Sequence, residues 1–111
     1  MSAPRLTRRV VLERPARTPD GAGGFAAGWV PLGTHWAEVV PVASGGAADE
    51  GMAPRRQRHK ITLRAAPPGS PARPVAGQRL REGARIFEIM GVTERDAGAR
   101  FLVCYTEEAV P

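Results

Sequence analysis

The residue types that most often carry chemistry are scarce in this chain and are spread far apart. Its two histidines, His35 and His59, and its one cysteine, Cys104, have no spacing that a metal site uses, so we expect no bound metal. The three serines lie at the N-terminus or in segments rich in glycine and proline, and no Ser/His/Asp grouping is evident. We therefore expect no catalytic site and no cofactor, in a protein that is not an enzyme.

Both histidines stand where a strand is expected to begin, so we expect them to face solvent or an interface. Cys104 stands between Val103 and Tyr105, and a thiol needs a neighbouring base and an activating site before it can act as a nucleophile. We expect it instead to be a small side chain that is buried or half-buried.

The segment Gly21-Ala22-Gly23-Gly24-Phe25-Ala26 fits a relaxed form of the glycine motif that holds dinucleotide phosphates. Such a site needs a strand directly before the motif and a helix directly after it. Pro15 and Pro19 precede the segment, and Gly28 and Pro31 follow it. These breaks favour a glycine-rich hairpin loop over a nucleotide site.

The sharpest charge feature is the run from Arg55 to Lys60, whose cations are Arg55, Arg56, Arg58 and Lys60. One interpretation is the solvated start of a strand, and the other is contact with nucleic acid or with an acidic neighbouring subunit. No aromatic residue is interleaved in the run, so it offers no stacking platform for single strands. Any DNA contact is then through phosphates and without sequence preference.

Two tryptophans, Trp29 and Trp36, flank the segment Pro31-Leu32-Gly33. Large aromatic side chains are usually anchors of a core. The alternative is that one of the two anchors a subunit interface.

The chain has 111 residues, the size of one domain with a modest core. It is 42% hydrophobic and 24% charged, too apolar for a wholly disordered chain. No run approaches the roughly 20 apolar residues of a membrane helix, and no apolar block follows the arginines near the start, so we expect neither a membrane span nor a secretory signal. One cysteine allows no intrachain disulfide, which fits a reducing compartment.

The net charge of +5 is carried almost wholly by arginine, since Lys60 is the only lysine. A GC-rich genome is one explanation. The other is contact with phosphates or acidic protein surfaces, which arginine binds through bidentate pairs.

Frequent glycines (13) and prolines (11) favour short strands joined by turns over a helical bundle. Pro15 is expected to end the first strand, and Asp20-Gly21 to mark a turn. Strands are predicted over residues 7–14, 25–30, 35–42, 60–64, 75–81, 84–92 and 100–107. Residues 43–54 are expected to form a long loop and residues 65–77 a stiff, proline-rich connection. The pattern predicts an all-β domain over residues 1–111, a small β-barrel of about six short antiparallel strands with a long loop after the second main strand.

Six segments of the chain follow one another in a recognisable order. They are Leu6-Thr7-Arg8-Arg9-Val10-Val11-Leu12-Glu13-Arg14-Pro15, Asp20-Gly21-Ala22-Gly23-Gly24-Phe25-Ala26-Ala27-Gly28-Trp29, Trp36-Ala37-Glu38-Val39-Val40-Pro41, His59-Lys60-Ile61-Thr62-Leu63-Arg64, Arg85-Ile86-Phe87-Glu88-Ile89 and the final Thr106-Glu107-Glu108. Together they resemble the phage head–tail joining family, the small head-completion or stopper proteins of long-tailed phages and gene transfer agents. The resemblance covers residues 5–108 and departs from the family at 65–77, which is longer than usual.

This resemblance implies a structural β-barrel subunit that assembles into a homo-oligomeric ring, commonly a hexamer, and joins head to tail. The ring sits below the portal and its adaptor ring and above the tail terminator or tail tube proteins. It helps to retain and gate packaged double-stranded DNA without reading its sequence. The protein is then expected in the virion or phage-like particle, at the head–tail interface, after assembly in the bacterial cytoplasm and without contact with a membrane.

The resemblance also maps residues 43–56 to a flexible loop that projects into the DNA channel. Ser44, Gly45, Gly46 and Gly51 supply small residues that let such a loop change shape. Asp49 and Glu50 are expected to repel DNA, whereas Arg55 and Arg56 attract it. Beyond the loop, Arg58 and Lys60 are candidates for contact with DNA or with another subunit.

Two other functions remain open. One is a tail-side joining or terminator protein at the next ring, and the other is a small OB-like module that binds nucleic acid. An isolated nucleic-acid module binds DNA with a steep dependence on salt, whereas a ring subunit is expected to bind free DNA weakly.

Overall fold

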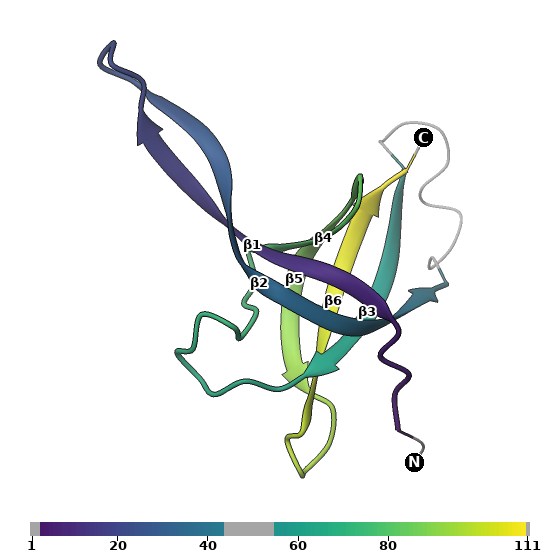
Figure 1. The fold of residues 1–111 in the computed structure, drawn as a ribbon. Helices are drawn as coiled ribbons and strands as arrows, with labels where there is room; N and C mark the ends of the chain where they lie inside the picture. Colours follow the sequence, from purple (N-terminus) through teal and green to yellow (C-terminus); the bar gives the residue numbers. More distant parts are fainter. Residues whose placement is uncertain (1–2, 44–54, 111) are drawn as a thin grey trace.

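The computed structural model describes residues 3–43 and 55–110, which form six strands and no helix. The strands are β1 (Arg8–Pro19), β2 (Phe25–Val42), β3 (Arg56–Arg64), β4 (Arg79–Glu82), β5 (Arg85–Glu94) and β6 (Phe101–Ala109). Neighbouring strands pair antiparallel in the order β1-β2-β3-β6-β5-β4, and β4 pairs with β1 to close the barrel (Figure 1). The predicted all-β fold is confirmed. Within the described ranges, no helix is long and apolar enough to cross a membrane.

The core lies inside the barrel and is supplied by alternate residues of its strands. Ile61 and Leu63 of β3 point inward, as their alternation with polar residues predicts, and both are fully buried. Phe87 of β5 is the largest of the fully buried side chains. The other members of the core are Val10, Leu12, Ala37, Leu80, Ile89, Leu102 and Cys104.

The first two strands extend well beyond the barrel, which the sequence did not predict. β1 does not end at Pro15 but continues to Pro19, and the two strands predicted over 25–30 and 35–42 are one strand, β2. Beyond Glu13, β1 pairs only with β2, so a proline that lacks an N–H can stand on an open edge without breaking a ladder. We call residues 14–30 the hairpin arm, which projects away from the barrel at the upper left of Figure 1.

A tight turn closes the tip of the hairpin arm. The Oδ1 atom of Asp20 accepts hydrogen bonds from the backbone N–H groups of Ala22 (2.8 Å) and Gly24 (3.1 Å). Gly21 and Gly23 have φ values of 81° and 85°, a region that favours glycine. The glycine-rich segment is therefore a hairpin turn followed directly by a strand, and the interpretation as a nucleotide site is excluded.

The connection from β3 to β4 is a series of turns rather than an extended segment. The strand predicted over 75–81 begins only at Arg79. Val75 to Gln78 instead form a turn in which the Val75 N–H donates to Oε1 of Gln78 (3.0 Å) and Gly77 has a φ of 92°. Pro74 is fully buried, so the connection is anchored to the barrel.

Candidate functional site

The charged residues that the sequence singled out gather at the end of the barrel where β2 ends and β3 begins. Of the predicted channel loop 43–56, the structure describes Ala43, Arg55 and Arg56. The predicted loop residues that lie outside the described ranges are Ser44, Gly45, Gly46, Asp49, Glu50 and Gly51. β3 holds the cations Arg56, Arg58 and Lys60 at this end.

Acidic residues of β5 and β6 lie beside the cations of β3. The Nη1 atom of Arg56 lies 2.8 Å from Oε2 of Glu88 and 4.0 Å from Oε1 of Glu107. The Nε atom of Arg58 lies 3.8 Å from Oε2 of Glu107, but the Arg58 side chain is 68% exposed. The basic run is therefore partly neutralised by neighbours across the sheet, which only the strand register reveals.

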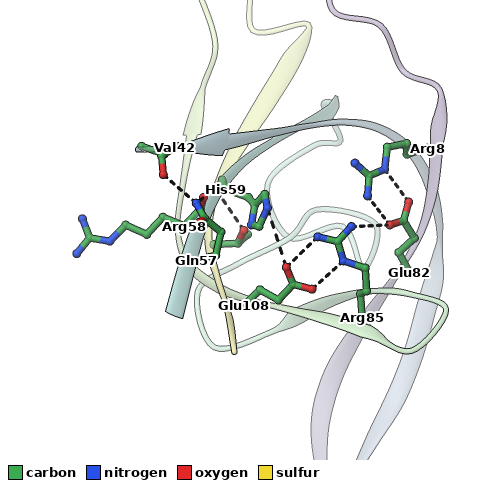
Figure 2. Close-up of polar contacts among 9 residues, drawn as sticks. Arg8, Val42, Gln57, Arg58, His59, Glu82, Arg85 and Glu108 are labelled. Atoms are coloured by element: carbon green, nitrogen blue, oxygen red, sulfur yellow. Dashed lines mark hydrogen bonds and ion pairs between the residues drawn. The ribbon is translucent and has the colours of Figure 1, made fainter. Parts of the chain in front are cut away.

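A network of five ionisable side chains, one from each of five strands, lies across this end of the barrel (Figure 2). The Nε atom of Arg8 donates to Oε2 of Glu82 at 2.8 Å, and Nη1 of Arg85 lies 3.8 Å from Oε1 of Glu82. Arg85 also binds Glu108 through two hydrogen bonds of 2.7 and 2.8 Å. The Oε1 atom of Glu108 lies 4.0 Å from Nε2 of His59. The network ties β1, β4, β5, β6 and β3 together where the barrel opens.

The contacts of this network fix its charge state. The hydrogen bond from Arg85 lowers the pKa of Glu108, and the hydrogen bond from Arg8 lowers the pKa of Glu82, each against the opposing effect of burial. The same bonds raise the pKa values of both arginines. Both carboxylates are therefore ionised at neutral pH, and the two pairs are charge-assisted.

His59 is buried, so the expectation that it faces solvent or an interface is wrong. Its side chain is 7% exposed, and its ring packs edge-on against Phe87 with the ring centroids 5.2 Å apart. Burial lowers the pKa of His59 below its usual 6.5, although Glu108 acts in the opposite direction. The signal was present in the sequence, because His59 continues the inward alternation of Ile61 and Leu63. Its Nδ1 atom is buried without a hydrogen-bond partner.

Two other predicted residues lie away from this end. His35 of β2 is half-buried, and burial lowers its pKa. Cys104 is fully buried, as one of the two alternatives predicted, and burial raises the pKa of its thiol to about 12. A thiol in that environment is not a nucleophile at neutral pH. Among residues 3–43 and 55–110, no cluster of three metal-binding side chains occurs.

A second charged cluster joins the hairpin arm to the barrel. The carboxylate of Glu13 lies 2.7 Å from Nε of Arg79 and 3.0 Å from Nε of Arg81. Burial raises the pKa of Glu13, but the hydrogen bonds from the two arginines outweigh it and lower the pKa overall. The guanidinium of Arg79 also stacks on the ring of Trp29, 4.1 Å from its centroid. One arginine therefore links the β4 edge of the barrel to the arm.

The sequence of the chain matches the model of a known protein family over nearly its whole length. The family model described as phage head completion protein matches residues 1–109. The chain belongs to the phage head completion protein family. A chain of a solved structure, the virion of a native gene transfer agent (GTA) particle, is 44% identical to this head completion protein with a TM-score of 0.80. The match covers 97% of this chain and 98% of that chain. No curated protein matches.

The resemblance read from the sequence is thus confirmed. The head completion protein has a structural role related to the phage head, and its predicted place in the virion is confirmed as well. The virion context of the similar chain points to assembly with other structural proteins of phage type.

The tryptophans of this head completion protein are not core anchors. Trp29 is 40% exposed and Trp36 is 57% exposed. Trp29 stands on the hairpin arm, beyond the barrel interior, and Trp36 precedes Ala37, which takes the inward position on β2. The interpretation of either tryptophan as a core residue is therefore wrong, and a role in an interface stays a prediction.

Proposed function

We propose that this head completion protein forms a homo-oligomeric ring of six copies that joins head to tail, below the portal and adaptor and above the tail. In this ring the segment 43–56 faces the central channel and helps to retain and gate packaged double-stranded DNA. The contact with DNA is electrostatic and independent of sequence. The protein acts by assembly, not by catalysis.

The observation that carries this proposal is the structure of the barrel end from which segment 43–56 leaves. Gln57 of β3 donates from Nε2 to the backbone oxygen of Val42 at 2.9 Å, so the last residue of β2 is tied to the start of β3. The five-residue network of Figure 2 lies directly beside this point and holds the other strands. A rigid mount of this kind is what a channel-facing segment needs, because its two ends then keep their position. The similar chain from a gene transfer agent virion supports the same assembly.

The ring is tested by electron microscopy of purified particles that carry the protein with a short tag at its C-terminus. We expect density for several copies around the axis between portal and tail. Tag density at the tail-side ring alone favours the tail terminator alternative. If the tagged protein is absent from the particle, the proposal is overturned.

DNA retention is tested with paired substitutions. Arg55→Gln together with Arg56→Gln removes the two cations at the C-terminal end of segment 43–56, and we expect filled heads to lose DNA faster in a nuclease-protection assay. The matched control is Arg64→Gln, an exposed cation at the opposite end of the same strand. Equal leakage from the two variants argues against a channel contact at this end.

The OB-like alternative is separated by DNA binding of the isolated protein. We expect weak binding, because Glu88 and Glu107 lie beside the cations of β3. Tight binding with a steep salt dependence favours the nucleic-acid module instead.

A further inference from the structure

One face of the hairpin arm carries exposed proline and aromatic residues, of which only Trp29 is contacted by the barrel, through Arg79. In the register of the arm, Pro15 pairs with Trp29, Arg17 with Ala27 and Pro19 with Phe25. Side chains two residues apart share a face of a strand, so these six residues lie on one side of the arm. Phe25 is 58% exposed and Trp29 is 40% exposed. No residue of the arm is buried, so the arm takes no part in the core.

Nothing within the single chain explains why the hairpin arm keeps its aromatic residues exposed. A two-stranded ribbon by itself is marginally stable in water. Exposed aromatic residues with an adjacent arginine are typical of the centre of a protein interface. The guanidinium of Arg17 lies over the ring of Phe25, 4.6 Å from its centroid, so the tip presents both an apolar and a cationic group. Asp20 adds an anion at the turn, since the N–H groups of Ala22 and Gly24 lower its pKa.

The direction of the arm is fixed where it leaves the barrel. The register shifts between Leu12, which pairs with Gly33, and Glu13, which pairs with Pro31, so Leu32 is an extra residue in β2. Gly33 has a φ of 143°, which favours glycine, and a bulge of this kind bends a strand. The Glu13–Arg79 pair and the stacking of Arg79 on Trp29 hold the bend. The arm then reaches about 20 Å beyond this point at roughly 3.3 Å per residue.

The barrel of the same chain carries a matching surface at the other end of β2. A pocket of 420 Å³ lies across β3, β6 and β5. Its apolar lining comes from Val42, Met90 and Tyr105, of which Met90 is 53% exposed and Tyr105 40%. Its charged lining comes from Arg58, Lys60 and Glu107. An apolar floor with two cations and one anion complements an arm tip that carries Phe25, Asp20 and Arg17.

We infer that the hairpin arm of one copy docks onto a second copy of this chain, with Phe25 in the pocket formed by Val42, Met90 and Tyr105. Phe25 and Val42 are the two ends of the 18-residue strand β2, and the arm points away from its own barrel (Figure 1), so it cannot fill the pocket of its own chain. Contact between two different surfaces of identical subunits is heterologous, and it builds a closed ring when the rotation from one copy to the next closes. The inference rests on the proposed ring and names the contact that builds it.

The contact is tested by cross-linking in assembled particles. Phe25→Cys and Met90→Cys are introduced together, and the particles are oxidised with copper phenanthroline. We expect a ladder of disulfide-linked multimers of this chain on a non-reducing gel, and none from either single variant. Cys104 does not interfere because it is buried and its thiol has a pKa of about 12.

Two outcomes overturn the inference while leaving the proposed ring intact. One is a ring visible by electron microscopy in the double variant without any ladder, and the other is a cross-link from Phe25→Cys to a different virion protein. Absence of the ring in the unmodified particle instead overturns the proposed function.

A second measurement does not depend on cross-linking. Phe25→Ser and Met90→Ser are each expected to lower the yield of head–tail joined particles at least tenfold. Neither changes the melting temperature of the isolated protein by more than a few degrees, because both side chains are exposed. The matched control is Val75→Ser, an apolar residue that is 49% exposed and lies outside the arm and the pocket. Joining at the normal yield in both test variants contradicts the docking.

Discussion

Replacing Glu108 by glutamine is the sharpest test of the five-residue network at the barrel end. Glu108→Gln keeps the shape of the side chain and removes its charge. Two charge-assisted hydrogen bonds from Arg85, of 2.7 and 2.8 Å, become at most one neutral acceptor contact. Glu108 is nearly buried, with 10% of its side chain exposed, so water can replace few of the hydrogen bonds that residue 108 loses.

The expected loss can be given a size from these contacts. A hydrogen bond to a charged group contributes about 1.5–3 kcal/mol to stability. Arg85 is 44% exposed, so water recovers part of the loss on the arginine side. We expect Glu108→Gln to lower the free energy of unfolding by about 2 kcal/mol and the melting temperature by about 8 °C.

The assay is urea unfolding of the purified protein at pH 7.5, followed by tryptophan fluorescence and by circular dichroism to check that the transition is two-state. The neighbouring residue gives a matched control. Glu107 has only contacts of 3.8 and 4.0 Å with Arg58 and Arg56, so we expect Glu107→Gln to change the unfolding free energy by less than about 0.5 kcal/mol. Equal losses in the two variants refute the claim that the network, rather than general surface charge, stabilises the barrel end.

Three further predictions follow from burial. The pKa of His59 lies below 6.5 in the folded protein, so the unfolded chain takes up a proton at this residue first as the pH falls. The contribution of neutral His59 to the free energy of unfolding is therefore complete above pH 6.5 and is lost as the pH falls from 6.5 to the folded pKa. We expect a smaller loss of stability in His59→Gln, measured as urea midpoints at pH 7.5 and 5.5. Phe87→Ala removes the largest buried side chain and should cost about 3–5 kcal/mol in the same assay, whereas the exposed Met90→Ala on the same strand should cost less than about 0.5 kcal/mol. The Cys104 thiol is buried and its pKa is raised, so it should resist a thiol reagent in the native protein and react fully in urea, and rapid native labelling would contradict its burial.

Much of the barrel could be predicted from the sequence because its core strands alternate cleanly. Ile61 and Leu63 between polar neighbours gave both the strand and its inward face, and the apolar run around Phe87 gave another. The turn at Asp20 was also visible, because aspartate followed by glycine is a strong turn signal. These features are local, so a window of a few residues contains them.

The parts that were missed depend on partners distant in the chain. Proline normally ends a strand, and nothing near Pro15 shows that its strand has only one neighbour there. The burial of Trp29 was predicted wrongly for the same reason, since the end of the barrel is set by where β4 pairs with β1. Trp36 lies within the barrel part of β2 but faces outward, because its neighbour Ala37 takes the inward position. The ion pair between Arg85 and Glu108 joins the neighbouring strands β5 and β6, and it can be found only from the register in which these strands pair. In the sequence, nothing distinguishes the five residues of the network from ordinary surface charges, because they come together only in the folded barrel.

The separation of the hairpin arm from the interior has a consequence for how this protein can change over generations. No arm residue contributes to the packed interior, so we expect substitutions at the tip to alter the proposed contact while the thermodynamic stability of the subunit changes little. Selection for folding and selection for recognition therefore act on different residues. A lineage can therefore exchange the tip at little cost in stability, and a foreign peptide can be grafted between Gly21 and Gly24 for the same reason.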